Sequence, residues 1–314
     1  LHTAYRRQRQ MCIRDRTCLV KWSKGTLSPL AHIINSMAPL TSRSIFGTDP
    51  VDEFASGIAD WIWENSQGHE ALEIEAKIGV MIDKSTNARI RLPIYTEAIV
   101  NMNEINARFE SNMSMKQHQI YNKLLNDLVA YSAQNLPQNE HMAYQHRKET
   151  DTFYDEVSEI TGQREHIRVT RDTRTKEIVP NGVVKKTRIA DLNVFCPTQP
   201  FDYRISINIE TPMYLPQSMS HPTFSREKDR LSYIQQNFSI DLTQVIEANR
   251  PSEPLHELEI EIRDVNYLMH LANEAQQIKG ESDRVWTQFE DHVLVLLNNI
   301  RLLIRNHDFG SGGR

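Results

Sequence analysis

Five glutamates recur at alternate positions in two short segments of this 314-residue chain. Glu73 and Glu75 lie in the first segment, and Glu257, Glu259 and Glu261 lie in the second. Alternate side chains of a β-strand share one face about 6.6–7 Å apart, so carboxylates in a row repel one another unless cations compensate. Glutamate is also depleted in strands. Because Mg²⁺ and Mn²⁺ prefer carboxylate oxygens as ligands, the pattern indicates one metal-binding carboxylate cluster.

Basic residues form a second set, on segments that also have the pattern of strands or strand edges. The set comprises Arg168, Arg171, Lys185, Lys186, Arg188, Lys228 and Arg230. Arginine and lysine side chains neutralise phosphate oxygens. A site with carboxylates on one side and these residues on another would suit a metal–polyphosphate complex.

Three segments have one aliphatic face and one polar or charged face: 72–78, 203–210 and 257–263. An antiparallel sheet with its polar face in water explains this alternation in any single strand. It gives no reason for two rows of glutamates beside the basic set, whereas a closed barrel with a hydrated, charged interior would bring these faces together. The sequence therefore predicts an α+β fold, a closed antiparallel β-barrel with helices packed on its outside.

Amphipathic segments supply helices for that outer face. Asp49-Pro50 predicts a helix start, followed by apolar residues at helical spacing over 51–62. Residues 112–133 predict a second helix, and Ser282 is expected to cap a long final helix. Asn181-Gly182, between short apolar runs, predicts the turn of a β-hairpin.

Composition limits the classes of protein that this chain can represent. The net charge of −5 excludes a uniformly basic surface, so a polyanion must be bound by a local cluster of Lys and Arg. Cys12, Cys18 and Cys196 lack metal-ligand spacing, which argues against a zinc site or a disulfide framework and favours a reducing compartment. No apolar run reaches membrane-spanning length, so no membrane partner is expected.

The two ends of the chain differ from its middle. Residues 1–24 are polar and basic, follow neither structural period and are similar to a translated sequencing adapter. We interpret them as a non-native or disordered leader; a basic arm that contacts RNA is the alternative. Residues 25–47 are predicted to be a linker, 48–308 the main domain, and 309–314 a flexible tail.

Five ordered motifs carry a family resemblance. Glu73-Ile74-Glu75-Ala76-Lys77 resembles the opening strand of the triphosphate tunnel metalloenzymes, and the motifs that follow it lie at 204–210, 226–233, 240–245 and 256–262. Together they resemble the fungal-type mRNA-capping RNA 5′-triphosphatase, the capping enzyme β subunit, over about residues 46–305. The resemblance implies an eight-stranded tunnel and metal-dependent removal of the γ-phosphate from nascent mRNA, the first step of cap formation.

The resemblance also implies roles for the glutamates. It implies that Mg²⁺ or Mn²⁺ is held by Glu73, Glu75 and Glu261. Glu257 and Glu259 would support the site through hydrogen bonds and ion pairs with the basic walls.

Further roles follow from the same resemblance. It implies that the phosphates are bound by Arg168, Lys186, Lys228 and Arg230, with Lys186 preferred to Lys185 because it fits the family motif better. Glu210 would orient or activate the attacking water, and Asp241 would brace a basic neighbour. The family usually has an arginine two residues before that aspartate, and here the position is Ser239.

Substrate and partners are expected from the resemblance alone. The substrate would be triphosphate-ended RNA and the partner the capping guanylyltransferase. The resemblance also implies a location in the nucleus and, as in some members of the family, a homodimer. A tunnel that hydrolyses inorganic tripolyphosphate or free nucleoside triphosphates is the alternative, since all these ligands share a triphosphate. A non-catalytic barrel that binds an anion or RNA is the alternative from another class.

Overall fold

The computed structural model of the protein describes residues 45, 51–157, 162–216, 221–281 and 287–308. The chain divides into two units, Leu1–Val51 and Asp52–Arg314, and all the helices and strands described belong to the second. The predicted leader, the tail and all of the predicted linker except Ile45 lie outside the described residues. The predicted domain boundaries therefore stay predictions.

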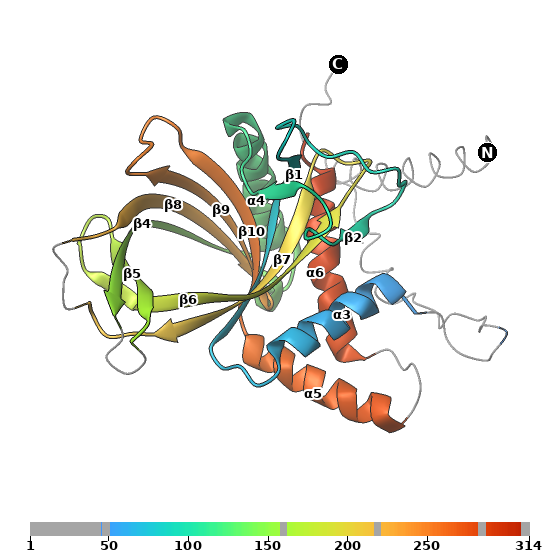
Figure 1. The fold of residues 1–314 in the computed structure, drawn as a ribbon. Coiled ribbons are helices and arrows are strands. Elements are labelled where there is room, and N and C mark those ends of the chain that lie inside the picture. Colours follow the sequence, from blue (N-terminus) through green and yellow to red (C-terminus); the bar gives the residue numbers. More distant parts are fainter. Residues whose placement is uncertain (1–44, 46–50, 158–161, 217–220, 282–286, 309–314) are drawn as a thin grey trace, which may run out of the picture. The chain divides into compact units, whose positions relative to one another are not determined.

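Eight strands close into an antiparallel barrel in the order β10-β9-β8-β4-β5-β6-β7-β1, because β1 also pairs with β10 (Figure 1). β3 extends from β1 and β2 pairs with β6, both outside the closed circuit. In chain order the elements are α3 (Glu53–Ser66), β1 (Leu72–Asp83), β2 (Ala98–Val100), β3 (Ala107–Glu110), α4 (Met115–Asn135), the 3₁₀ turn η2 (Gln138–Glu140), β4 (Ala143–Val157), β5 (Arg164–Asp172), β6 (Ile178–Phe195), β7 (Asp202–Pro212), β8 (Phe224–Gln235), β9 (Phe238–Glu247), β10 (Leu255–Ile262), α5 (Val265–Glu281) and α6 (Gln288–Arg305). The predicted barrel is confirmed.

Helices cover the aliphatic outer face of the barrel. Ile74 and Ile78 of β1 are fully buried in one hydrophobic cluster with Ile58 of α3, Leu268 of α5 and Val293 of α6. Figure 1 shows α3, α5 and α6 together on one side, and α4 beside β10. Each fully buried aliphatic side chain contributes about 1.5–3 kcal/mol. Period-two strands thus place their apolar side chains under helices and leave their charged side chains for the interior.

Two helix starts differ from the prediction. α3 begins after Asp52, whose carboxylate accepts a hydrogen bond from the Ala55 amide at 3.1 Å. α6 begins after Thr287, which forms a reciprocal capping box with Glu290. The predicted caps, Asp49 and Ser282, lie outside the described residues. Both observed caps have side-chain oxygens that satisfy the free amides of the first turn, which decides where each helix starts.

The predicted Asn181-Gly182 hairpin turn is wrong. Both residues lie inside β6, where Asn181 has a φ of +55° and the pairing with β5 shifts register. The turn between β5 and β6 instead follows Asp172, whose carboxylate accepts hydrogen bonds from the amides of Arg174 and Thr175 at 2.9 and 2.7 Å. A positive φ serves a β-bulge as well as a hairpin turn, so the dipeptide alone could not distinguish them.

The predicted helix over 112–133 corresponds to α4, which begins after the N-cap Ser114. Its predicted apolar stripe includes Tyr121 and Leu125, which are fully buried. Within the described part of the chain, no helix combines the length and apolarity that crossing a bilayer requires.

Candidate active site

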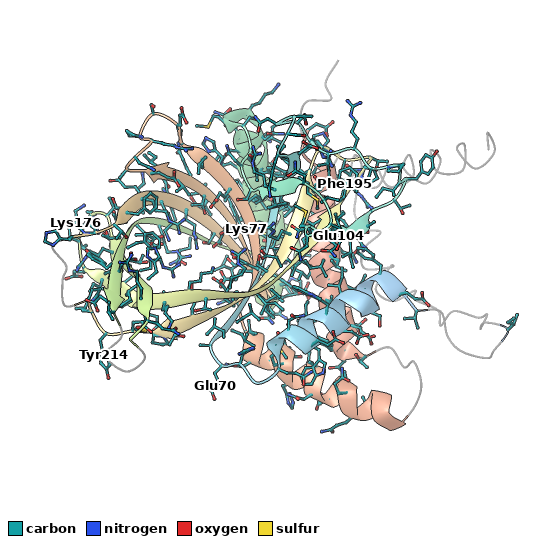
Figure 2. All side chains as sticks on the ribbon, in the orientation of Figure 1. Glu70, Lys77, Glu104, Lys176, Phe195 and Tyr214 are labelled. Carbon is teal, nitrogen blue, oxygen red and sulfur yellow. The ribbon has the colours of Figure 1, made fainter. Side chains whose placement is uncertain are left out.

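The glutamates of β1 and β10 meet on one wall of the barrel interior. Glu75 lies directly opposite Glu261, and Lys77 lies opposite Glu259, in the register of these strands. The Lys77 ammonium forms a close ion pair with Glu259 and lies 3.7 Å from Oε2 of Glu75. Figure 2 shows Lys77 in the midst of the side chains that the barrel strands carry. The two predicted rows therefore form one cluster, with a lysine inside it to which sequence analysis assigned no role.

The carboxylates of this cluster have different affinities for protons. Burial, together with the charges of Glu73 and Asp241, raises the pKa of Glu261 to about 7. Burial also favours the neutral form of Glu259, but the charges of Lys77 and Arg230 outweigh it and lower the pKa to about 2. The cluster thus contains one firmly ionised carboxylate and another whose charge is only partly compensated.

A lysine of β6 connects the glutamates to the rest of the tunnel. The Lys186 ammonium pairs closely with Glu73 and lies 3.4 Å from Oε1 of Glu75 and 4.0 Å from Oε1 of Glu210. Lys185, the next residue, points to the other side of the strand and pairs with Glu165 at 2.9 Å. The structure therefore places Lys186 in the tunnel beside the predicted metal ligands, and Lys185 away from them.

The Asp241 side chain holds an arginine. Its Oδ2 accepts a hydrogen bond from Nη1 of Arg230 at 3.1 Å, and its Oδ1 accepts one from the Ser239 hydroxyl at 2.7 Å. Arg230 also lies 3.8 Å from Glu259. The serine that replaces the family arginine thus still contacts Asp241, and the ion pair of that aspartate is supplied by β8.

The basic row on β8 has acidic partners that sequence analysis missed. Lys228 lies 3.0 Å from Asp151 and 3.4 Å from Glu149, both on β4, and Arg226 lies 3.0 Å from Asp151. Asp151 is completely buried. The pattern of β4 could not be recognised because charged or polar residues occupy both of its faces, as in Lys148-Glu149-Thr150-Asp151.

Arg168 reaches the tunnel from β5 and pairs with Glu210 of β7 at 2.9 Å. Four buried donor atoms on tunnel-facing residues have no hydrogen-bond partner among the described residues: Nε of Arg147, Arg168 and Arg230, and Oγ1 of Thr243. An unpaired buried donor costs about 1–3 kcal/mol, so an anion that accepts these hydrogen bonds would be stabilised. The tunnel interior fits a ligand with several anionic oxygens.

A divalent metal in the tunnel would have to bind among the glutamates of β1 and β10. Among the described residues, no three His, Cys, Asp or Glu side chains are spaced as a ligand set, and Lys186 pairs with both Glu73 and Glu75. The donors are nevertheless carboxylate oxygens on neighbouring strands, the type that Mg²⁺ and Mn²⁺ prefer. The donor atoms therefore suit such a metal. In this structure the Lys186 ammonium is the cation that pairs with Glu73 and Glu75.

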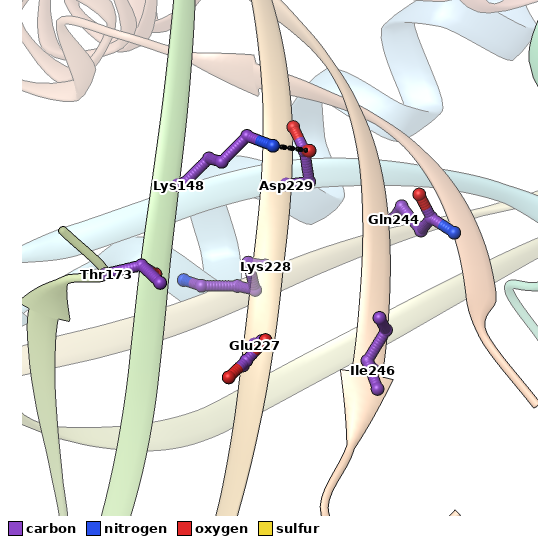
Figure 3. A pocket seen from close by; sticks show the side chains of 7 residues that line it. All are labelled: Lys148, Thr173, Glu227, Lys228, Asp229, Gln244 and Ile246. Carbon is purple, nitrogen blue, oxygen red and sulfur yellow. Dashed lines mark ion pairs between the residues drawn. The ribbon is translucent and has the colours of Figure 1, made fainter. Parts of the chain in front are cut away.

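A separate cavity of about 170 Å³ lies on β4, β8 and β9. Figure 3 shows its lining, in which Lys148 and Asp229 form an ion pair of 2.8 Å. Glu227 and Asp229 flank the tunnel residue Lys228 in sequence, so they lie on the opposite face of β8. Of the predicted site residues, Lys228 is the one that also lines this cavity.

Comparisons with known proteins agree with this geometry. Residues 48–308 match the model of a family described as mRNA capping enzyme, beta chain. The mRNA-capping enzyme subunit beta of Schizosaccharomyces pombe is 35% identical over 242 residues, 76% of this chain and 75% of the relative. The subunit of the same name from Cryptococcus neoformans is 34% identical over 281 residues, 87% of this chain and 66% of the relative. The solved structure of S. pombe Pct1 RNA triphosphatase in complex with the Spt5 CTD superposes with a TM-score of 0.73 at 31% identity, covering 85% of this chain and 99% of that one.

Proposed function

This chain belongs to the family of the mRNA capping enzyme, beta chain, and we propose that its tunnel removes the γ-phosphate from the triphosphate end of nascent mRNA. The chain is an RNA 5′-triphosphatase, a polynucleotide 5′-phosphatase that prepares a diphosphate end for capping. One observation carries the proposal: a closed tunnel combines a wall of glutamates with arginines whose buried Nε atoms have no hydrogen-bond partner among the described residues.

The basic residues of the tunnel would bind the triphosphate. Arg168, Lys228 and Arg230 would donate hydrogen bonds to its oxygens and stabilise the charge that develops as the β–γ bridging bond breaks. Lys186 would move from the glutamates to a phosphate oxygen. The two arginines would act most strongly in the transition state, because their ion pairs with Glu210 and Asp241 already hold them in the tunnel walls.

Glu210 would orient the attacking water. Its carboxylate is held by Arg168 at 2.9 Å and lies 4.0 Å from the Lys186 ammonium, so it is adjacent to two residues that would bind phosphate. A water that donates a hydrogen bond to Glu210 would attack the γ-phosphorus. The diphosphate-ended RNA would leave from the opposite side, with inorganic phosphate as the other product.

We propose Mg²⁺ or Mn²⁺ as the cofactor, held by Glu73, Glu75 and Glu261. When bound, such a metal would polarise a γ-phosphate oxygen and offset its charge. Glu259, paired with Lys77 and Arg230, would keep these two cations in place beside the ligands. Glu257, which accepts a hydrogen bond from Ser111 at 3.3 Å, would support the same wall.

We also propose that the protein works in the nucleus with the capping guanylyltransferase, because its family is named as a subunit of the capping enzyme. Coexpression of both chains and purification through one of them tests the partnership. Co-elution at a constant ratio supports it, and separate elution contradicts it. The mass of the free chain in solution tests the expected homodimer.

Release of labelled γ-phosphate tests the activity and the metal together. We expect release from triphosphate-ended RNA with Mg²⁺ or Mn²⁺, and none after chelation with EDTA. Free ATP and inorganic tripolyphosphate, assayed in parallel, distinguish the RNA substrate from the other triphosphates. Tight binding of triphosphate-ended RNA without phosphate release under either metal would contradict the activity.

The adjacent lysines of β6 provide a matched pair of variants. We expect Lys186→Ala to lower kcat for γ-phosphate release by about 10²- to 10³-fold, the usual loss of one preorganised donor. Lys185→Ala removes the ion pair with Glu165 on the other face of β6 and should change kcat less than about twofold. Equal losses in the two variants would contradict the assignment.

A further inference from the structure

Three aromatic side chains lie together on the tunnel-facing sides of three adjacent strands. The Phe153 ring of β4 stacks on the His166 ring of β5, with 5.1 Å between centroids and 12° between planes. Phe224 of β8 packs at 5.6 Å from Phe153. By strand alternation, these rings share a face with Asp151, Arg168 and Arg226, which form the ion pairs of the tunnel.

The His166 ring is fixed in place yet exposed. Its Nδ1 forms a 2.6 Å hydrogen bond with the Asp155 carboxylate, and one of its faces lies on Phe153. The side chain is nevertheless 56% exposed. An oriented ring with free surface loses little conformational entropy when a planar ligand stacks on it.

Arg168, which is assigned to phosphate binding, is a neighbour of this ring. Arg168 is the next residue on the same face of β5, about 7 Å along the strand. Phe153 lies directly opposite Arg168 in the β4–β5 register. The Arg226 guanidinium lies 5.5 Å above the Phe153 ring and holds Asp151. The distance from the rings to Arg168, which would bind the phosphate chain, is therefore about the length of one nucleotide.

We propose that the His166 ring, which itself stacks on Phe153, is the platform on which the first nucleobase of triphosphate-ended RNA stacks. This inference rests on the proposed function and adds to it a contact that tripolyphosphate lacks. Aromatic side chains beside cationic ones bind single-stranded nucleic acid without regard to sequence, because every base has a stacking face. His166 would thus favour RNA over inorganic triphosphates and accept any first base.

Steady-state kinetics of His166→Ala tests the platform. We expect KM for triphosphate-ended RNA to rise about tenfold, equivalent to about 1.4 kcal/mol, with kcat and tripolyphosphate hydrolysis unchanged. His166→Phe should restore KM because it restores the ring. His146→Ala is the matched control, since His146 is also a half-exposed histidine held by a carboxylate, that of Asp229 at 2.5 Å, but on the outer face of β4.

A binding measurement separates this inference from the proposed activity. RNA with a 5′-diphosphate end and 2-aminopurine as its first base requires no hydrolysis, and stacking quenches its fluorescence. We expect quenching by the wild type and by His166→Phe, and a loss of quenching in His166→Ala. Full quenching by His166→Ala, or an equal loss of tripolyphosphate hydrolysis in that variant, would overturn the platform and leave the triphosphatase intact. Absence of γ-phosphate release by the wild type would instead overturn the activity.

Discussion

Glu73→Gln is expected to lower kcat for γ-phosphate release from triphosphate-ended RNA by about three decades, or about 4 kcal/mol of barrier. The substitution keeps the volume of the side chain and removes its charge. Glu73 pairs with Lys186, and its Oε2 also accepts a hydrogen bond from Asn208 at 2.9 Å. The amide would retain the contact with Asn208 and would bind a divalent metal poorly, so loss of a metal ligand dominates. Initial rates at saturating Mg²⁺ measure the effect.

The ion pair between Glu165 and Lys185 provides the control for this experiment. It is a Glu–Lys contact of 2.9 Å on the other face of β6. Glu165→Gln should leave kcat within about twofold. A higher Mg²⁺ requirement in Glu73→Gln alone would connect the loss to the metal. Near-normal activity of Glu73→Gln would contradict the assignment of the metal ligands.

Period-two alternation predicted the part of the barrel in which the two faces of a strand have different chemistry. In β1, Ile74 and Ile78 face helices while Glu73, Glu75 and Lys77 face the tunnel. Apolar residues therefore mark one face of the strand and charged residues mark the other. β4 follows the same geometry, but its outer face carries charged and polar residues as well. Without that contrast the period disappears, and Glu149 and Asp151 were missed with the strand.

Helix α5 was missed for a different reason. Part of its buried side consists of the small residues Ala272 and Ala275, with Leu268 and Leu271 as larger anchors. Alanine packs closely against neighbouring elements but adds little to a hydrophobic pattern. Tertiary contacts with α6, which the sequence alone does not reveal, complete the buried face of this helix.

Contacts between distant strands decided which predicted residues share a site. The identity of the charged residues predicted two opposed walls, yet only the register sets Glu75 opposite Glu261. The same holds for Asp241, which has Arg230 from another strand as its partner despite the serine at 239. Sequence motifs thus named residues that lie together in the tunnel, without Lys77, Glu149 and Asp151, and the closure of the barrel determined their pairing.

A second large effect is expected on stability. Asp151→Asn should lower the free energy of unfolding by about 3–5 kcal/mol, because it leaves the buried Lys228 and the half-buried Arg226 close together without their common anion. Asp151 is completely buried and also accepts a hydrogen bond from Thr170 at 2.8 Å, which the amide can still accept. The loss would therefore come from charge. Denaturant unfolding at pH 7 measures it, and a fall of about 10 °C in Tm should accompany it.

The pH dependence of that loss identifies its cause. Burial raises the pKa of Asp151, but Lys228 and Arg226 outweigh burial and hold it below the ordinary value of 3.8. A depressed folded-state pKa stabilises the protein above pH 3.8, and the contribution disappears as the pH falls through the folded-state value. The difference in the free energy of unfolding between wild type and Asp151→Asn should be constant near neutral pH and should disappear at low pH. Asp127→Asn, in an exposed pair with Lys123, should change stability by less than about 0.5 kcal/mol at every pH. A loss in Asp151→Asn that persists unchanged at low pH would mean that packing, and not the shared carboxylate, holds the basic wall of the tunnel together.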